Sequence, residues 1–152
     1  MNAPIRRQSR VWHAAFSVLL RAVPRRVALL AARRTALPYT EIVIVGRRTG
    51  VARSSVVTLF ELDGRWYVGN PNGDAQWARN LAAAGSAVVL RSTTRTTVAA
   101  AVLPHGAERD RVVLATAHQP PPANLVYLFG RGHVLAAGSY FRLDPISPEE
   151  VC

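Results

Sequence analysis

The stretch TEIVIVGRRTGVARSSVVTLFELDGRWYV, residues 40–68, decides the fold of this chain. Residues 40–46 and 54–62 are rich in β-branched side chains, which suit the pleated surface of a sheet, so both runs predict strands. Asp63 and Gly64 form a strong hairpin signal, because a tight two-residue turn needs positive φ at its central residues. The β pattern resumes over residues 65–68. We therefore predict three consecutive strands, the last two joined as a hairpin.

The chain after this stretch alternates between helical and β patterns. A turn cluster at residues 70–74 precedes a predicted helix over Gln76–Ala84, for which Gly85 is a suitable C-terminal cap. Residues 87–90, 96–103 and 134–143 predict further strands, and residues 107–117 predict a helix. The fold class is therefore α+β or mainly β, with about six short antiparallel strands curled into a barrel and helices packed outside.

Apolar residues recur at three- and four-residue steps before residue 40, which predicts helices. Pro24 divides the segment, so we predict one helix over Ser9–Ala22 and another over Pro24–Arg33, both flanked by arginines. Residues 1–34 form an amphipathic basic helical segment with two interpretations. It lies on an anionic membrane surface, or it packs its apolar stripe on the domain core with its arginines in water. We favour the second.

Charge and composition limit the chemistry. All 19 basic residues are arginine and the formal net charge is +10, which excludes lysine Schiff bases and P-loop lysines and favours an anionic ligand. The single cysteine, Cys152, excludes an internal disulfide and leaves no case for structural zinc, so a reducing cytoplasm is the expected compartment. The uncharged runs are too short or too proline-rich to span a bilayer, so we expect a soluble protein of one domain.

The segment GRRTGVAR, residues 46–53, gathers three guanidinium groups and a hydroxyl between two predicted strands. We call it the arginine turn. Glycines let the backbone turn and approach a ligand closely, and arginine pairs with phosphate or carboxylate through two parallel hydrogen bonds. The turn is therefore a candidate anion cradle. The alternative is a solvated hairpin loop with no ligand.

A second candidate lies at the start of the predicted helix over residues 76–84. Trp77 and Asn80 are three residues apart and so share one helical face, close to a helix N-terminus with its unpaired N–H groups. An indole wall and an amide suit a polar aromatic ligand. The alternative is that Trp77 belongs to the core.

The arginine turn, the hydrophobic hairpin, Asn72-Gly73 and the Trp-x-x-Asn-Leu run of residues 77–81 together resemble the deazaflavin-dependent nitroreductase and quinone reductase family. That family is a branch of the flavin-binding split β-barrels, and the resemblance covers residues 41–103. It implies a single split β-barrel domain over residues 1–152. It further implies an oxidoreductase that uses reduced coenzyme F420, with flavin mononucleotide (FMN) as the alternative cofactor, and passes a hydride to a quinone- or nitroaromatic-like acceptor.

The resemblance also implies roles for single residues. The phosphate and polyglutamate tail of the coenzyme would be bound by Arg47, Arg48, Thr49 and Arg53. The deazaflavin ring would be met by the strand after the arginine turn and by the following turn and helix, through Ser54, Ser55, Val57, Asn72, Gly73, Trp77 and Asn80. Tyr127 is the one candidate for a catalytic residue, in a segment over residues 120–127 that stands where the family has a lid. Val56 and Pro71-Asn72 depart from the family pattern, which bears on the substrate side of the site.

Rival interpretations remain. The chain could be a noncatalytic split-barrel module that stores or senses a flavin or deazaflavin. Nucleic-acid binding is suggested by the basic charge, but the excess lies in one N-terminal segment without a recognisable motif, so we expect no nucleic-acid partner. The expected partners are a small-molecule acceptor, the inner face of an anionic membrane in peripheral contact with residues 1–34, and a second copy in a homodimer. No histidine has metal-ligand spacing, and we expect no metal.

Overall fold

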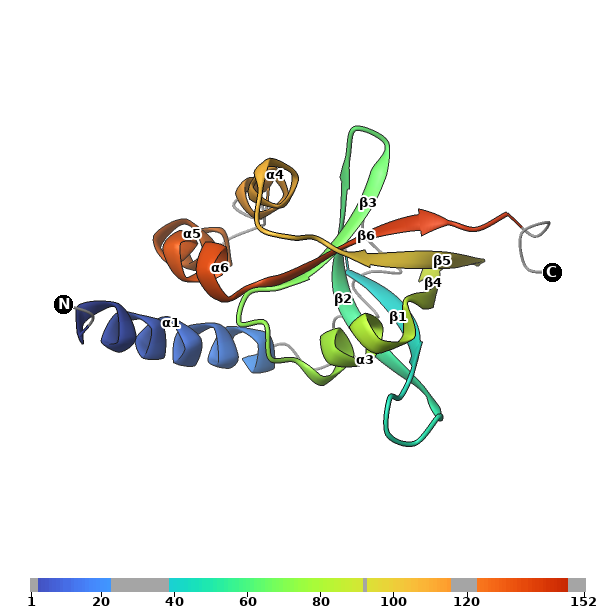
Figure 1. Ribbon diagram of the computed structural model, residues 1–152, viewed down its shortest axis with the longest axis horizontal. Coiled ribbons are helices and arrows are strands. Elements are labelled where there is room, and N and C mark those ends of the chain that lie inside the picture. Colours follow the sequence, from blue (N-terminus) through green and yellow to red (C-terminus); the bar gives the residue numbers. More distant parts are fainter. Residues whose placement is uncertain (1–2, 23–38, 92, 116–122, 148–152) are drawn as a thin grey trace.

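A computed structural model describes residues 3–22, 39–91, 93–115 and 123–147 of the chain. Its centre is a closed barrel of six strands in the order β1-β2-β3-β6-β5-β4, with antiparallel pairing throughout (Figure 1). The predicted fold class is confirmed. The strands are β1 (Tyr39–Val45), β2 (Ala52–Leu62), β3 (Arg65–Asn70), β4 (Ser86–Arg91), β5 (Thr94–Val102) and β6 (Ser139–Pro145).

The barrel interior is filled by alternate side chains of each strand. Strand residues alternate between the two faces of a sheet, so cross-strand partners such as Ile42 and Val89 point to the same side. Closure leaves no unpaired sheet edge among the six strands. The barrel core consists of branched side chains with one aromatic ring: Ile42, Ile44, Val57, Leu59, Val68, Val89, Val98, Phe141 and Leu143, together with Ala78 and Leu81 from a helix and Ala87.

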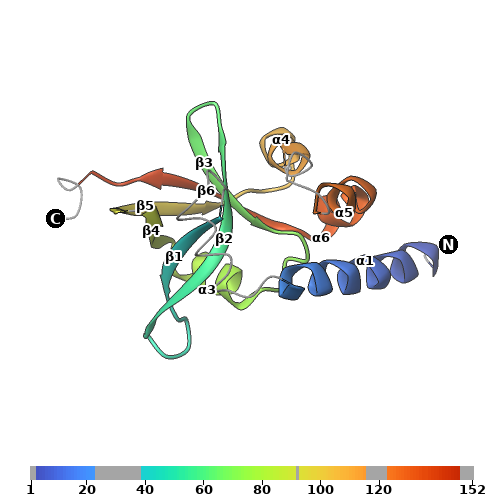
Figure 2. The ribbon, with the colours of Figure 1, turned by 180° about the vertical axis from the view of Figure 1, so that it is seen from behind.

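Four helices lie together on one side of the barrel, and a fifth helix packs separately against β1, β4 and β5 (Figures 1 and 2). The four are α1 (Ala3–Ala22), α4 (Ala107–Ala115), α5 (Ala123–Phe129) and α6 (Arg131–Ala137); the fifth is α3 (Gln76–Ala84). The four helices cover the outer face of β2, β3 and β6, where a second hydrophobic cluster forms around Phe16, Tyr67, Leu103, Val112, Val113, Tyr127, Val134 and Tyr140.

Two local signals predicted from the sequence are confirmed. Asp63 and Gly64 have φ of 52° and 74°, as a primed hairpin turn requires, and β2 and β3 pair on either side of them. The predicted helix over residues 76–84 is α3, and it ends at Gly85, whose φ is 68° and whose N–H donates to the carbonyl oxygen of Leu81.

The prediction of one strand over residues 134–143 was wrong in its first half. Residues 131–137 form α6, which buries Val134 against the second cluster, and β6 begins only at Ser139. Leu135, Ala136 and Ala137 are strong helix formers, and this preference outweighs the β pattern of Val134 alone. The segment over residues 120–127, which stands where the family has a lid, forms part of α5 from Ala123 onward, while residues 120–122 lie outside the described residues.

Helix α1 begins six residues before the predicted Ser9, at Ala3. Pro4 does not prevent this, because a first helical turn needs no N–H from its proline. The predicted helix over residues 24–33 lies outside the described part of the chain. No helix in the described part is long and apolar enough to cross a membrane.

A buried arginine joins α4 to the end of α6. Arg109 is 2% exposed, and its guanidinium donates to the carbonyl oxygens of Leu135 (2.7 Å), Val134 (3.3 Å) and Gly138 (2.6 Å). These carbonyls lie at the C-terminus of α6, where the helix dipole favours a positive charge. Arg109 also lies over the ring of Tyr140, at 5.8 Å from its centroid. The side chain therefore holds α6 in the position from which β6 enters the barrel.

Phe16 is the side chain that docks α1 onto the other helices. It is fully buried, contacts the ring of Tyr127 edge-on at 5.0 Å and stacks on His133 at 6.0 Å. We predict that Phe16→Ala lowers the free energy of unfolding by about 3 kcal/mol, since it leaves a cavity that the helices cannot close. Urea unfolding followed by circular dichroism measures this. Val18→Ala on the exposed side of the same helix should change it by less than about 0.5 kcal/mol. Equal losses in the two variants would contradict the docking role.

Candidate functional site

A hollow of about 420 Å³ lies between the arginine turn and α3. We call it the α3 hollow. The turn that forms one wall is held by backbone hydrogen bonds from Gly46 to Val51 (2.9 Å) and from Gly50 to Gly46 (2.8 Å), and Gly50 has φ of 66°. Thr49 accepts a further bond from the N–H of Val51 (3.3 Å). The hollow is lined by Ile44, Gly46, Arg47, Arg48, Thr49, Arg53, Ser54, Ser55, Gln76, Trp77 and Asn80.

The pairing of β1 with β2 points two polar side chains of β2 toward the hollow. Ile44 pairs with Arg53 and Ile42 pairs with Ser55, so these residues share the inner face of the sheet. Val57 follows on the same face but is only 5% exposed and belongs to the barrel core. The inner face of β2 therefore changes from apolar to polar as the strand leaves the core. This change opens the hollow at the end of the barrel.

Arg47 bridges the turn and the helix. Its Nη1 donates to Oδ1 of Asn80 (2.8 Å) and to Oε1 of Gln76 (3.1 Å), and its Nη2 donates to Oε1 of Gln76 (3.2 Å). The backbone N–H of Arg47 also donates to Oδ1 of Asn80 (3.3 Å). Gln76 and Asn80 are four residues apart on α3, so they lie on one helical face. The guanidinium group is therefore held against α3, in the lining of the hollow, by two neutral amide oxygens.

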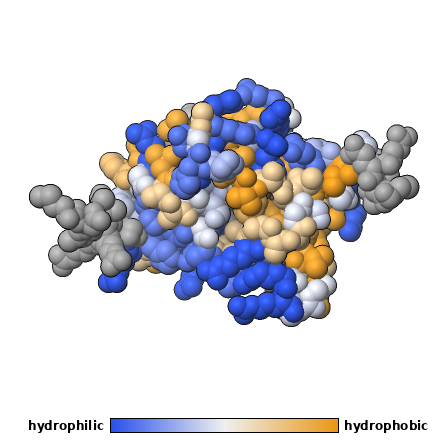
Figure 3. All heavy atoms as spheres, in the orientation of Figure 1, coloured by the Kyte–Doolittle hydropathy of each residue, from blue (hydrophilic) through white to orange (hydrophobic). Residues whose placement is uncertain are grey.

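The other cationic side chains of the hollow make no such contacts. Arg48 and Arg53 are exposed, and no described residue accepts a hydrogen bond from either guanidinium. In the described part of the chain no acidic residue lines the hollow, so three positive charges lie there without a carboxylate. Figure 3 shows a hydrophilic area at the lower edge of the molecule, with hydrophobic residues to its right. An anionic group that enters the hollow would therefore not compete with a carboxylate of the lining for these arginines.

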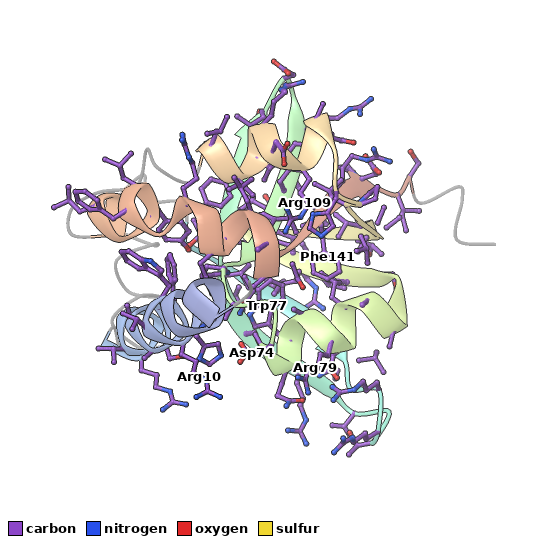
Figure 4. The ribbon with its side chains drawn as sticks, turned by 60° about the vertical axis from the view of Figure 1, so that its left-hand side comes forward. Arg10, Asp74, Trp77, Arg79, Arg109 and Phe141 are labelled. Atoms are coloured by element: carbon purple, nitrogen blue, oxygen red, sulfur yellow. The ribbon has the colours of Figure 1, made fainter. Side chains whose placement is uncertain are left out.

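Trp77 forms the apolar wall. The side chain points from α3 toward the barrel, where its ring lies 6.2 Å from that of Phe141 (Figure 4). Trp77 is half-buried and packs against the core cluster while it also lines the hollow. The core interpretation of this residue is therefore confirmed, and the indole also forms part of the lining of the hollow.

The structure brings together most of the site residues predicted from the sequence, but not all of them. Val57, Asn72, Gly73 and Tyr127 do not line the hollow. Tyr127 is 8% exposed and lies in the second hydrophobic cluster beside Phe16. The residues around the hollow are Arg47, Arg48, Thr49, Arg53, Ser54, Ser55, Trp77 and Asn80. Sequence reasoning missed Gln76, although its spacing of four residues from Asn80 on a predicted helix was a usable signal.

Asn72 and Gly73 belong to a turn that meets α1 and α6. The side-chain nitrogen of Asn72 donates to the carbonyl oxygen of His13 and to Oγ of Ser17, both at 3.1 Å. Gly73 has φ of 72°, and a Cβ there would collide with the carbonyl oxygen of Ala137. These contacts give both residues a structural role in holding the helices against the β3–α3 turn.

His133 extends the same contacts. The amide nitrogen of Asn72 faces the carbonyl oxygen of His13, which can only accept, so Oδ1 of Asn72 accepts from Nε2 of His133 at 3.0 Å. Nδ1 of His133 is then unprotonated, and it is buried without a hydrogen-bond partner among the described residues. Burial lowers the pKa of His133, and the nearby His13 lowers it further, against an opposing effect of Asp74.

No protein-family model and no curated protein sequence matches the chain. Solved structures with a similar fold include the heme storage protein HutZ from Vibrio cholerae, at 15% identity and a TM-score of 0.55 over 78% of this chain and 88% of that one. An F420H2-dependent reductase, FDR-A, is 16% identical with a TM-score of 0.51 over 70% and 94% of the two chains. A structure described as a domain-swapped dimer is 16% identical with a TM-score of 0.51 over 70% and 80%. These similarities establish the split-barrel fold.

We predict that the protein becomes less stable as the pH is lowered, because of His133. A histidine whose pKa is lowered on folding binds fewer protons in the folded than in the unfolded chain, so stability is lost as pH falls below the ordinary value of 6.5 toward the lowered pKa. His133→Gln keeps a donor for Asn72 without the titration, and should flatten the dependence of melting temperature on pH between about 6.5 and 5. The exposed His105→Gln is the control. Equal pH profiles for His133→Gln and the unmodified chain would contradict the prediction.

Proposed function

We propose that the chain is an oxidoreductase that binds reduced coenzyme F420 in the α3 hollow and serves a quinone- or nitroaromatic-like acceptor. One observation carries this proposal: the hollow places three guanidinium groups beside one face of a half-buried indole. A deazaflavin coenzyme has the matching parts, since it joins an anionic tail to a flat aromatic ring. The likeness in fold to an F420H2-dependent reductase agrees with the proposal.

The side chains of the hollow fit such a coenzyme by their chemistry. Arg48, Arg53 and the hydroxyl of Thr49 would hold phosphate or carboxylate oxygens at the open end, where charged tails stay partly in water. Trp77 and Ile44 would flank the ring at the inner end. When bound, the reduced coenzyme supplies the hydride, and the protein supplies orientation and a site from which water is partly excluded.

The described residues offer the hollow no strong acid or base. Those that line it include no histidine, carboxylate, cysteine or tyrosine, so binding and orientation are the tasks these side chains can perform. Tyr127 lies in the helix-covered cluster, which favours water over this phenol as the source of a proton. This arrangement agrees with a reaction whose chemistry is carried by a cofactor.

The second candidate function is a noncatalytic carrier. The same cationic hollow would bind FMN, oxidised F420 or the propionates of a heme, and the heme storage protein of similar fold makes storage a concrete alternative. The two functions differ in turnover. A reductase oxidises reduced F420 when menadione or a nitroaromatic compound is added, whereas a carrier binds the cofactor and leaves its redox state unchanged.

We also propose that the chain pairs with a second copy, as the similar domain-swapped structure does. Contact with an anionic membrane through residues 1–34 remains a separate proposal. In its described part, α1 exposes Val11 and Val18 beside Arg10 and Arg21, a combination that suits a lipid headgroup surface. Replacement of Arg10 and Arg21 by glutamate, which leaves Phe16 in place, should abolish co-sedimentation with phosphatidylglycerol vesicles at low salt. Undiminished co-sedimentation would remove the proposal.

We predict that the unmodified chain binds oxidised F420 more tightly than FMN, with a Kd in the micromolar range. Arg47→Ala and Arg53→Ala should each weaken F420 binding by about tenfold or more, because each removes charge-assisted hydrogen bonds. Fluorescence titration measures both. Arg79→Ala is the matched control, since Arg79 is an exposed arginine of α3 that does not line the hollow (Figure 4). Unchanged affinity in both hollow variants would contradict the placement of the coenzyme.

A further inference from the structure

The hydrogen bonds of Arg47 use only part of its guanidinium group. A guanidinium has five N–H donors in one plane. Nη1 donates both of its hydrogens, one to Gln76 and one to Asn80, and Nη2 donates one hydrogen to Gln76. Oε1 of Gln76 therefore occupies the edge between the two terminal nitrogens. Asn80 takes the remaining hydrogen of Nη1.

Two parallel donors of Arg47 remain. They are the Nε–H and the second hydrogen of Nη2, which lie along the same edge, and no described residue accepts from them. This edge is one of the two that bind a carboxylate or phosphate through two parallel hydrogen bonds. Arg47 lines the hollow, so the unused edge belongs to a side chain at the site itself.

The partners of Arg47 are uncharged. Amide oxygens fix the orientation of the guanidinium and leave its positive charge in place, whereas a carboxylate would fix it and also neutralise it. A glutamate at position 76 would satisfy the helix N-terminus better, because a negative charge there interacts favourably with the dipole. The glutamine keeps the full charge of Arg47 available for a ligand.

We propose that Gln76 is a positioning residue, which together with Asn80 directs the Nε/Nη2 edge of Arg47 toward a ligand oxyanion group with two terminal oxygens. The inference rests on the proposed function for the identity of the ligand. The inference adds that Arg47 binds the oxyanion group of the ligand through two hydrogen bonds, and that its side chain is already oriented before the ligand binds. Such preorganisation raises affinity because less side-chain freedom is lost on binding.

The test compares Gln76→Glu, nearly identical in shape, with Gln76→Ala. Glutamate should weaken the binding of oxidised F420 by about tenfold and reduce its dependence on salt, because the new carboxylate neutralises Arg47. Alanine should weaken binding by about threefold, because the charge stays and only its orientation is lost. Ala82→Glu adds the same charge at an exposed position of α3 outside the hollow, and should change affinity by less than about twofold.

The Arg47→Ala background makes the test specific. There Gln76→Glu should cause a much smaller loss of affinity than in the unmodified chain, since the side chain that it neutralises is gone and only its direct repulsion of the anionic ligand is left. Gln76→Glu matching Ala82→Glu in the unmodified background would overturn the proposal. So would an equal loss of affinity with and without Arg47.

A measurement without ligand separates this inference from the proposed function. Gln76→Glu should raise the melting temperature by about 1–3 °C through an ion pair with Arg47, and Arg47→Ala should remove that part of the rise. If neither F420 nor FMN binds the unmodified chain, the proposed function fails. The difference in melting-temperature change between the two backgrounds still decides whether residue 76 interacts with Arg47. A melting temperature that responds identically in both backgrounds would overturn the positioning role.

Discussion

The register between β1 and β2 is the constraint on which the rest of the site depends. Side chains alternate along a strand, so the pairing of Ile44 with Arg53 places an apolar and a cationic residue on the same face. A shift of one residue would turn Arg53 outward and bring Ser54 toward the barrel interior. The buried residues farther along the two strands, Ile42 in β1 and Val57 in β2, make such a shift costly, because it would expose the core. The apolar core thus fixes where the charges of the hollow lie.

The hollow forms where the barrel core ends and α3 begins to cover it. Trp77 closes the core on one side and forms a wall of the hollow on the other, while Arg47 ties the arginine turn to the same helix. Because its partners are amides, the tie orients a charge without cancelling it. The contacts that stabilise this end of the molecule are therefore also those that line the hollow, whereas the other end is stabilised by the packing of four helices around Phe16.

The sequence predicted what depends on neighbouring residues. Asp63-Gly64 and Gly85 demand a particular backbone conformation, so the hairpin and the end of α3 could be placed to the residue. The arginine turn and Trp77 were found as two separate motifs, and their approach depends on strand pairing that no short pattern encodes. Resemblance to a family supplied the link between them. It also supplied roles for Asn72 and Tyr127, which instead contact helices far away in the chain.

Nuclear magnetic resonance of the 15N-labelled chain during titration with oxidised F420 tests the central claim most directly. The claim is that one hollow between the arginine turn and α3 binds an anionic aromatic cofactor. We predict that the amide resonances of residues 46–55 and 76–80 shift together with one affinity, and that those of α5 and α6 stay in place. Shifts confined to α5 and α6, around Tyr127, with none in the arginine turn, would contradict the account.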